Sequence, residues 1–85
     1  MPPSVKMPGG IVELDLHGKN VYQAKVAIDA ALRRPGSMVR LRLIHGSSRG
    51  TALREMIWSD YAHHPKVRRL LRITEDVTDA VLREL

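Results

Sequence analysis

IVELDLHG, residues 11–18, is the stretch of the chain that decides its fold. Its apolar and polar side chains alternate, so that Val12, Leu14 and Leu16 share one side and mostly acidic residues occupy the other. A period of two is typical of a β-strand with one face in a core and one polar face. The stretch therefore predicts a strand that ends at His17.

The residues after this strand predict a helix and a second strand. Asn20 and Gln23 have the spacing of a capping box, an arrangement that begins many helices. Apolar residues then recur at helical intervals until the Arg-Arg-Pro-Gly segment at 33–36, which combines helix-end cations with two helix breakers. Residues 39–43 alternate between apolar and basic, so we expect a second half-buried strand that ends at His45.

The second half of the chain predicts one more helix and two strands. After a short glycine-bracketed loop, Thr51 is in position to cap a helix that Pro65 stops after His64. Residues 67–73 and 77–85 are expected to form short strands joined by a turn. A short helix is the alternative for the last of these segments.

The order strand, helix, strand, helix, strand, strand predicts an α/β protein. Because a strand–helix–strand crossover makes its strands parallel and a hairpin adds an antiparallel strand, the sheet should be mixed. We expect a two-layer α+β sandwich, βαβαββ in order, with both helices on one face of a four-stranded sheet. The other face then carries Glu13, Asp15, His17, Arg40 and Arg42 towards solvent.

The length of 85 residues allows one domain with one core. Residues 1–10 are rich in Pro and Gly and have little to bury, so we expect a flexible lead-in at 1–10 and a folded domain at 11–85. The chain has no cysteine, which excludes disulfides and a thiolate metal site.

The charge balance favours an acidic partner. Fourteen Lys and Arg residues against nine Asp and Glu residues give a formal net charge of +5, which points to nucleic acid. One Trp, two Tyr and no Phe are too few for a base-stacking platform. No apolar run approaches the roughly 20 residues of a membrane helix, and no secretory signal is visible. We therefore expect a cytoplasmic protein without a membrane partner, and a monomer by default.

The first motif that carries chemistry pairs Asp15 with His17. A period of two places both side chains on the same strand face, close to each other. A carboxylate beside an imidazole can raise its basicity, orient its tautomer or share a divalent metal with it. The carboxyl end of a strand is also where ligands of open α/β sheets bind. The alternative is that Asp15 only caps the following turn while His17 packs against its neighbours or lies in solvent.

The second motif is the loop His-Gly-Ser-Ser-Arg-Gly that begins at His45. It connects a strand to a helix, so the free N–H groups of the first helical turn favour a phosphate there. Glycine lets the backbone approach an anion, although a need for positive φ explains the glycines equally well. His45 contacts phosphate or, alternatively, bonds a backbone carbonyl and holds the loop. The residues assigned to phosphate or nucleic-acid binding are His45, Gly46, Ser47, Ser48, Arg49 and Gly50, with Arg40 and Arg42 on the sheet.

The two motifs together resemble those of the Smr (small MutS-related) domain, of which this chain would be a short stand-alone member. The first signature of the family, Leu-Asp-x-His-Gly, is matched by residues 14–18. The second, His-Gly-x-Gly-x-Gly, is matched by His45, Gly46 and Gly50. The resemblance extends over nearly the whole chain from Ile11 onward.

The resemblance implies a fold similar to the C-terminal domain of translation initiation factor 3. It also implies endonuclease activity on DNA or RNA, with Asp15 and His17 as catalytic residues. The leading hypothesis is a metal-dependent endonuclease that acts on RNA or structured DNA, with Mg²⁺ or Mn²⁺ bound by Asp15. A non-catalytic nucleic-acid-binding module, or an adaptor on a ribosome or repair complex, is the alternative.

The chain departs from the family pattern at two places. Ser48 replaces the middle glycine of the second motif, and residues 73–77 lack the glycine-rich turn that usually precedes the last strand. Both places belong to loops expected to face a substrate. They shift the balance towards the non-catalytic alternative, relative to a complete match.

Overall fold

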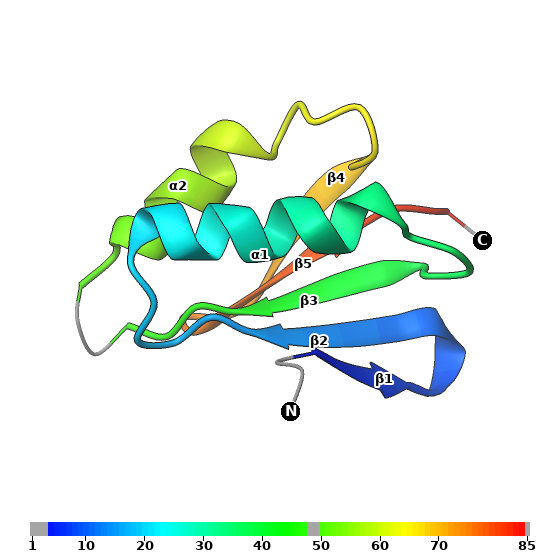
Figure 1. Ribbon diagram of the computed structural model, residues 1–85, viewed down its shortest axis with the longest axis horizontal. Helices are drawn as coiled ribbons and strands as arrows, with labels where there is room; N and C mark the ends of the chain where they lie inside the picture. Colours follow the sequence, from blue (N-terminus) through cyan, green and yellow to red (C-terminus); the bar gives the residue numbers. More distant parts are fainter. Residues whose placement is uncertain (1–3, 48–49, 85) are drawn as a thin grey trace.

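The structure is a computed structural model that describes residues 4–47 and 50–84. Five strands form one mixed sheet, and two α-helices lie on one of its faces (Figure 1). The order across the sheet is β1-β2-β3-β5-β4. The elements are β1 (Ser4–Met7), β2 (Ile11–Asp15), α1 (Val21–Arg33), β3 (Arg40–Ile44), α2 (Ala52–Asp60), β4 (Arg69–Thr74) and β5 (Val77–Val81), with a 3-10 turn at Pro8–Gly10.

The predicted α+β class and the placement of both helices on one face are confirmed, but the predicted strand count of four is wrong. The additional strand, β1, runs antiparallel to β2 with Met7 opposite Ile11. The expectation of a flexible lead-in at 1–10 is therefore wrong for residues 4–10. The Pro-Gly-Gly segment that suggested disorder forms the tight turn that leads the chain into β2.

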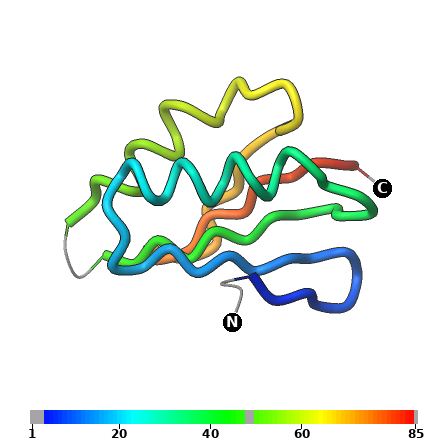
Figure 2. Tube along the Cα trace, in the orientation of Figure 1, coloured from blue at the N-terminus to red at the C-terminus, as the bar shows by residue number. Residues whose placement is uncertain are grey.

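The parallel pairing of β2 with β3 positions the loops that matter for function. The two strands are in register from Ile11 opposite Arg40 to Asp15 opposite Ile44. Because the parallel strands end on the same side of the sheet, the loops that follow them lie side by side, at the left of Figure 2.

The last strand, β5, is antiparallel and lies between β3 and β4, so it is not an edge strand. It is a strand as predicted, and not the alternative helix.

The two helices begin in different ways. The Asn20 side chain accepts a hydrogen bond from the Gln23 N–H (2.8 Å), and the Gln23 side chain accepts one from the Asn20 N–H (3.0 Å), so the predicted capping box is confirmed. Thr51 precedes α2, but its side chain makes no capping hydrogen bond within the described residues. Helix α2 also ends at Asp60, before the predicted end at His64.

The core lies between the helices and the sheet face beneath them. Helix α1 contributes Ala24, Ile28 and Leu32, and the sheet contributes its alternate leucines, all of them buried. The other buried apolar side chains of the main cluster include Leu14, Leu16, Leu41, Leu43, Met56, Ile57, Tyr61 and Ala80.

Among the described residues, neither helix has the length and apolarity needed to cross a membrane.

Candidate functional site

The two sequence motifs meet at the carboxyl ends of β2 and β3. A Cβ atom built on Gly46 would lie 3.6 Å from the Cβ of His17, so the two loops are in contact distance. Between them is an open pocket of about 430 Å³. Its lining consists of His17, Gly18, Lys19, Asn20, Val21, His45, Gly46, Ser47, Gly50, Ala52 and Leu53. The juxtaposition expected from the sequence is therefore present; we refer to this cavity as the motif pocket.

Asp15 holds His17 through two hydrogen bonds to one oxygen. The ring Nδ1 of His17 lies 2.6 Å from Asp15 Oδ1, and the His17 backbone N–H donates to the same oxygen at 3.1 Å. The hydrogen bond from the ring is the main reason that the pKa of Asp15 lies below its ordinary value. Burial opposes it, and the hydrogen bond from the His17 backbone N–H adds a smaller lowering effect. Since a carboxylate only accepts, Nδ1 carries a proton, and in the neutral ring Nε2 keeps a lone pair.

The N-termini of both helices point at the motif pocket. Asn20 and Val21 at the start of α1, and Ala52 and Leu53 at the start of α2, belong to its lining. The first N–H groups of a helix lack intrahelical acceptors, and each N-terminus carries about half a positive charge. Lys19 adds a full positive charge to the same lining. The pocket is therefore suited to an anion.

His45 faces inward and has both ring nitrogens engaged. Its side chain is buried, with Nδ1 3.0 Å from the carbonyl oxygen of Gly46 and Nε2 3.0 Å from Thr78 Oγ1. Trp58 Nε1 donates to the same threonine oxygen at 3.2 Å. Of the two roles left open by the sequence, these contacts match the one in which His45 holds the loop.

The turn between β4 and β5 supports the same loop. The backbone oxygen of Asp76 accepts hydrogen bonds from the N–H groups of His45 (2.9 Å) and Gly46 (3.1 Å). The Ser47 hydroxyl donates to Asp76 Oδ1 at 2.5 Å, so this hydroxyl, assigned to phosphate from the sequence, already has a protein acceptor. The assigned residues Ser48 and Arg49 lie outside the described residues.

Sequence reasoning missed Asp76, Thr78 and Trp58 as parts of this region. A signal existed for Asp76, because it lies in the turn predicted between the last two strands. The resemblance placed residues 73–77 in a loop expected to face a substrate, but no signal showed that this turn would bond the loop after β3. That depends on the pairing of β5 with β3, in which Val77 lies opposite Ile44.

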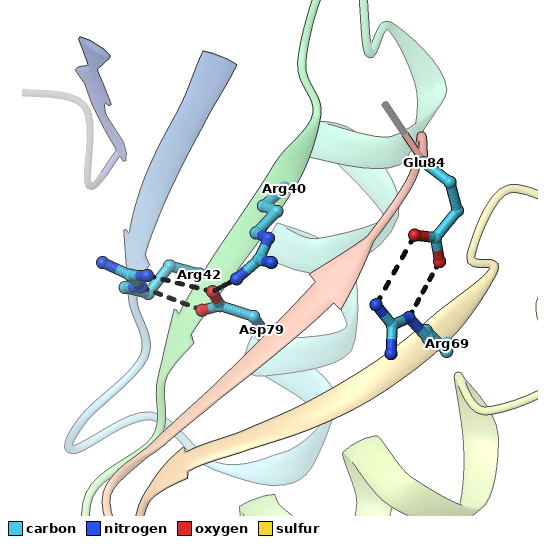
Figure 3. Close-up of polar contacts among 5 residues, drawn as sticks. All are labelled: Arg40, Arg42, Arg69, Asp79 and Glu84. Atoms are coloured by element: carbon cyan, nitrogen blue, oxygen red, sulfur yellow. Dashed lines mark hydrogen bonds and ion pairs between the residues drawn. The ribbon is translucent and has the colours of Figure 1, made fainter. Parts of the chain in front are cut away.

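Arg40 and Arg42 are not part of the motif pocket. They lie on the sheet face without helices and point at Asp79, which is fully buried (Figure 3). Arg42 donates from two nitrogens to the two carboxylate oxygens, at 2.9 and 3.0 Å, and Arg40 donates at 3.3 Å. Their side chains are 35% and 23% exposed respectively, so neither projects freely into solvent as expected. Their assignment to nucleic acid stays a prediction.

The described residues do not form a resident metal site. Mg²⁺ and similar ions take about six oxygen ligands, commonly one or two carboxylates with waters and substrate phosphates. No group of three or more His, Cys, Asp or Glu side chains suited to a metal occurs in residues 4–47 and 50–84. Asp15, the predicted ligand, already accepts two hydrogen bonds at Oδ1. A metal role for Asp15 would depend on oxygens from elsewhere and stays a prediction.

The comparison with known proteins identifies the family. No protein-family model matches the chain, and no curated protein matches its sequence. Among solved structures, the chain is similar to the Smr domain of MutS2 from Thermus thermophilus, with a TM-score of 0.75 and 30% sequence identity. The alignment covers 85% of this chain and 98% of that domain. With that identity over nearly the whole relative, and with both signature motifs in contact, the chain belongs to the Smr domain family.

Proposed function

We propose that this Smr domain binds the sugar–phosphate backbone of RNA or structured DNA in the motif pocket and cleaves it there. The observation that carries the proposal is that His17, held at Nδ1 by Asp15, lines the same pocket as the N-termini of both helices. A base and an anion-binding surface are thus within reach of one phosphodiester group.

Binding would depend on the positive potential that the two helix N-termini and Lys19 create in the pocket. A phosphate in front of two helix N-termini gains on the order of 0.3–1 kcal/mol from each helix dipole, and backbone N–H groups can donate to its oxygens. Lys19 in the lining and the net charge of +5 add long-range attraction. These contacts read the backbone and not the bases, so sequence preference should be weak.

Cleavage would use His17 as the base. Its Nε2 atom accepts the proton of the attacking oxygen, from water or a ribose hydroxyl, while that oxygen forms a bond to phosphorus. The bond to the leaving oxygen breaks, and the imidazolium returns the proton to it. Asp15 keeps the ring in the correct tautomer and stabilises its charged form. The helix N–H groups offset the charge that develops on the phosphate oxygens.

The cleavage test uses labelled single-stranded RNA, hairpin RNA and branched DNA. General acid–base catalysis contributes about 10²- to 10⁴-fold, so His17→Ala and Asp15→Ala should lower cleavage by at least about 100-fold and leave binding within a few-fold. The matched control is His63→Ala, since His63 is exposed and outside the pocket lining. Cleavage by both variants at the wild-type rate would show that this mechanism is wrong.

The same assay decides the predicted dependence on Mg²⁺ or Mn²⁺. Each substrate is incubated with EDTA, with Mg²⁺ and with Mn²⁺. Full activity in EDTA would remove the metal role assigned to Asp15 and leave the role of His17 intact. Activity that appears only with an added ion would support a metal held jointly by Asp15 and the substrate.

A binding module without catalysis is the second candidate, because the pair is open to water. The side chains of His17 and Asp15 are 73% and 45% exposed, whereas enzymes commonly exclude water from reacting groups. This candidate predicts salt-sensitive binding and no cleavage under any metal condition. An adaptor on a ribosome or repair complex would instead show no salt-dependent binding to naked nucleic acid.

A further inference from the structure

We propose that Thr78 and Trp58 are positioning residues for the motif pocket. They fix the tautomer of His45, and through this ring they hold the backbone of Gly46 next to His17. The inference deepens the proposed function, and rests on it wherever nucleic acid is concerned. Neither residue lines the pocket itself, and their hydrogen bonds connect them to it through His45.

The polarity of the hydrogen bonds follows from the chemistry of the two ends. The Gly46 carbonyl oxygen can only accept, so His45 Nδ1, 3.0 Å away, must carry a proton. The indole N–H of Trp58 can only donate, so it gives its hydrogen to Thr78 Oγ1. In a neutral ring, His45 Nε2 is then the acceptor for the Thr78 hydroxyl hydrogen. Each donor and acceptor in this row of hydrogen bonds, from Trp58 to Gly46, then has one consistent role.

Burial makes this arrangement costly to change. Thr78 is fully buried and His45 is 4% exposed. A buried donor or acceptor left without a partner costs about 1–3 kcal/mol, so the opposite tautomer, which would place Nδ1 without a hydrogen against a carbonyl oxygen, is disfavoured. The chain of contacts links α2, which carries Trp58, to β5 and to the end of β3.

The consequence for the pocket lies in the peptide groups around Gly46. The N–H of Gly46 donates to the Asp76 backbone oxygen, and its C=O accepts from His45. Gly46 has a φ of +72°, and a Cβ built on it would lie 3.6 Å from His17 Cβ. A carbonyl oxygen that turned towards a bound phosphate would repel it. The hydrogen bond from His45 therefore keeps this backbone in a form compatible with an anion.

The first test measures the tautomer directly. Nitrogen NMR of the histidine side chains in wild-type protein should show His45 with the hydrogen on Nδ1 and an unprotonated Nε2. In Thr78→Val, which removes the hydroxyl at similar volume, the Gly46 carbonyl still requires the hydrogen on Nδ1, but Nε2 loses its hydrogen bond. The Nε2 and Gly46 amide resonances should therefore shift. In Thr78→Ser, which keeps the hydroxyl, both signals should return to their wild-type positions.

The second test measures binding to a labelled single-stranded RNA. We expect Thr78→Val and Trp58→Phe to weaken binding by about three- to tenfold, the loss that corresponds to one neutral hydrogen bond, and Thr78→Ser to restore it. Circular dichroism and thermal melting check that each variant is folded. Ser37→Ala is the control, because Ser37 is exposed and lies outside the motif-pocket lining.

The two tests separate this inference from the proposed function. An Nε2–H form of His45 in the wild type, or unchanged Nε2 and Gly46 resonances in Thr78→Val, would overturn the positioning role. Unchanged RNA affinity in that variant, with wild-type binding intact, would do the same. If wild-type protein binds no RNA, the proposed function fails, while the Nε2 and Gly46 resonances still decide whether Thr78 positions the loop.

Discussion

At the scale of the residue, Asp79 is a carboxylate whose side chain is shielded from water. It is fully buried on the sheet face that has no helices, covered by Arg40 and Arg42. A buried carboxylate persists when it is paired and its oxygens are hydrogen-bonded, and here three contacts from two guanidinium groups do both. These contacts also compete with any phosphate for the two arginines. On this face, Arg69 and Glu84 form a second, more exposed ion pair (Figure 3).

This geometry predicts an unequal cost for the three partners. Asp79→Ala should destabilise the protein by about 1–3 kcal/mol, because it removes the acceptor of two guanidinium groups that are partly exposed and can still reach water. Arg42→Met should cost more than Arg40→Met, since Arg42 makes two contacts and Arg40 one longer contact. Urea unfolding followed by circular dichroism measures all three. Equal losses for the two arginine variants would contradict the assignment of Arg42 as the main partner.

At the scale of the element, the turn between β1 and β2 depends on two successive glycines in different surroundings. Gly9 and Gly10 have φ values of +80° and +77°, a region that side chains with a Cβ rarely adopt. A Cβ on Gly9 would meet no atom within 4 Å. On Gly10 it would lie 2.8 Å from Val39 Cγ2 and 3.2 Å from the Ser37 backbone oxygen. Gly10 also accepts a hydrogen bond from the Val39 N–H at 2.7 Å.

The pair provides a matched experiment on the β1–β2 turn. Gly9→Ala should cost about 1–2 kcal/mol, the price of a left-handed conformation alone. Gly10→Ala should cost about 1–3 kcal/mol more, because its Cβ also forces Val39 or the backbone at Ser37 to move. Thermal unfolding of the two variants gives the difference. If Gly10→Ala were no less stable than Gly9→Ala, the close approach of β1's turn to Val39 would be wrong.

At the scale of the whole molecule, charge and helix direction point to the same end. The net charge is +5, and both helices begin at the motif pocket. Lys19 lies in the pocket lining, whereas Lys25 pairs with Asp60 at 2.8 Å, between α1 and the end of α2. That pairing raises the pKa of Lys25 and lowers that of Asp60. The two lysines therefore differ in their availability to a phosphate backbone.

The expected result is a difference in salt dependence. For single-stranded nucleic acid, the logarithm of the binding constant falls with the logarithm of salt concentration by about 0.7 for each phosphate contacted. Lys19→Gln should reduce the magnitude of this slope by about 0.7, and Lys25→Gln should leave it unchanged. Fluorescence anisotropy at several salt concentrations measures the slope. An equal reduction by both variants would mean that binding depends on net charge and not on the pocket.

Much of the fold follows from local patterns. The alternation in residues 11–16 and 39–43, and the capping box at Asn20, correctly place two strands and the first helix. Strand β1 was missed because a sequence rich in Pro and Gly describes a tight turn and a disordered tail equally well. The end of α2 at Asp60 was missed because Pro65 limits a helix without requiring it to continue that far.

The sequence by itself determined the elements from β2 onward and that Asp15, His17 and the loop after β3 share one sheet edge. The hydrophobic period, the helix caps and the parallel crossovers depend on residues close together in the sequence, so the sequence alone predicts them. Only the tertiary structure decided that Thr78 reaches His45, that Asp76 supports Gly46 and that Asp79 draws in two arginines. Each of these contacts arises because β5 lies between β3 and β4, and no local pattern specifies which strands become neighbours.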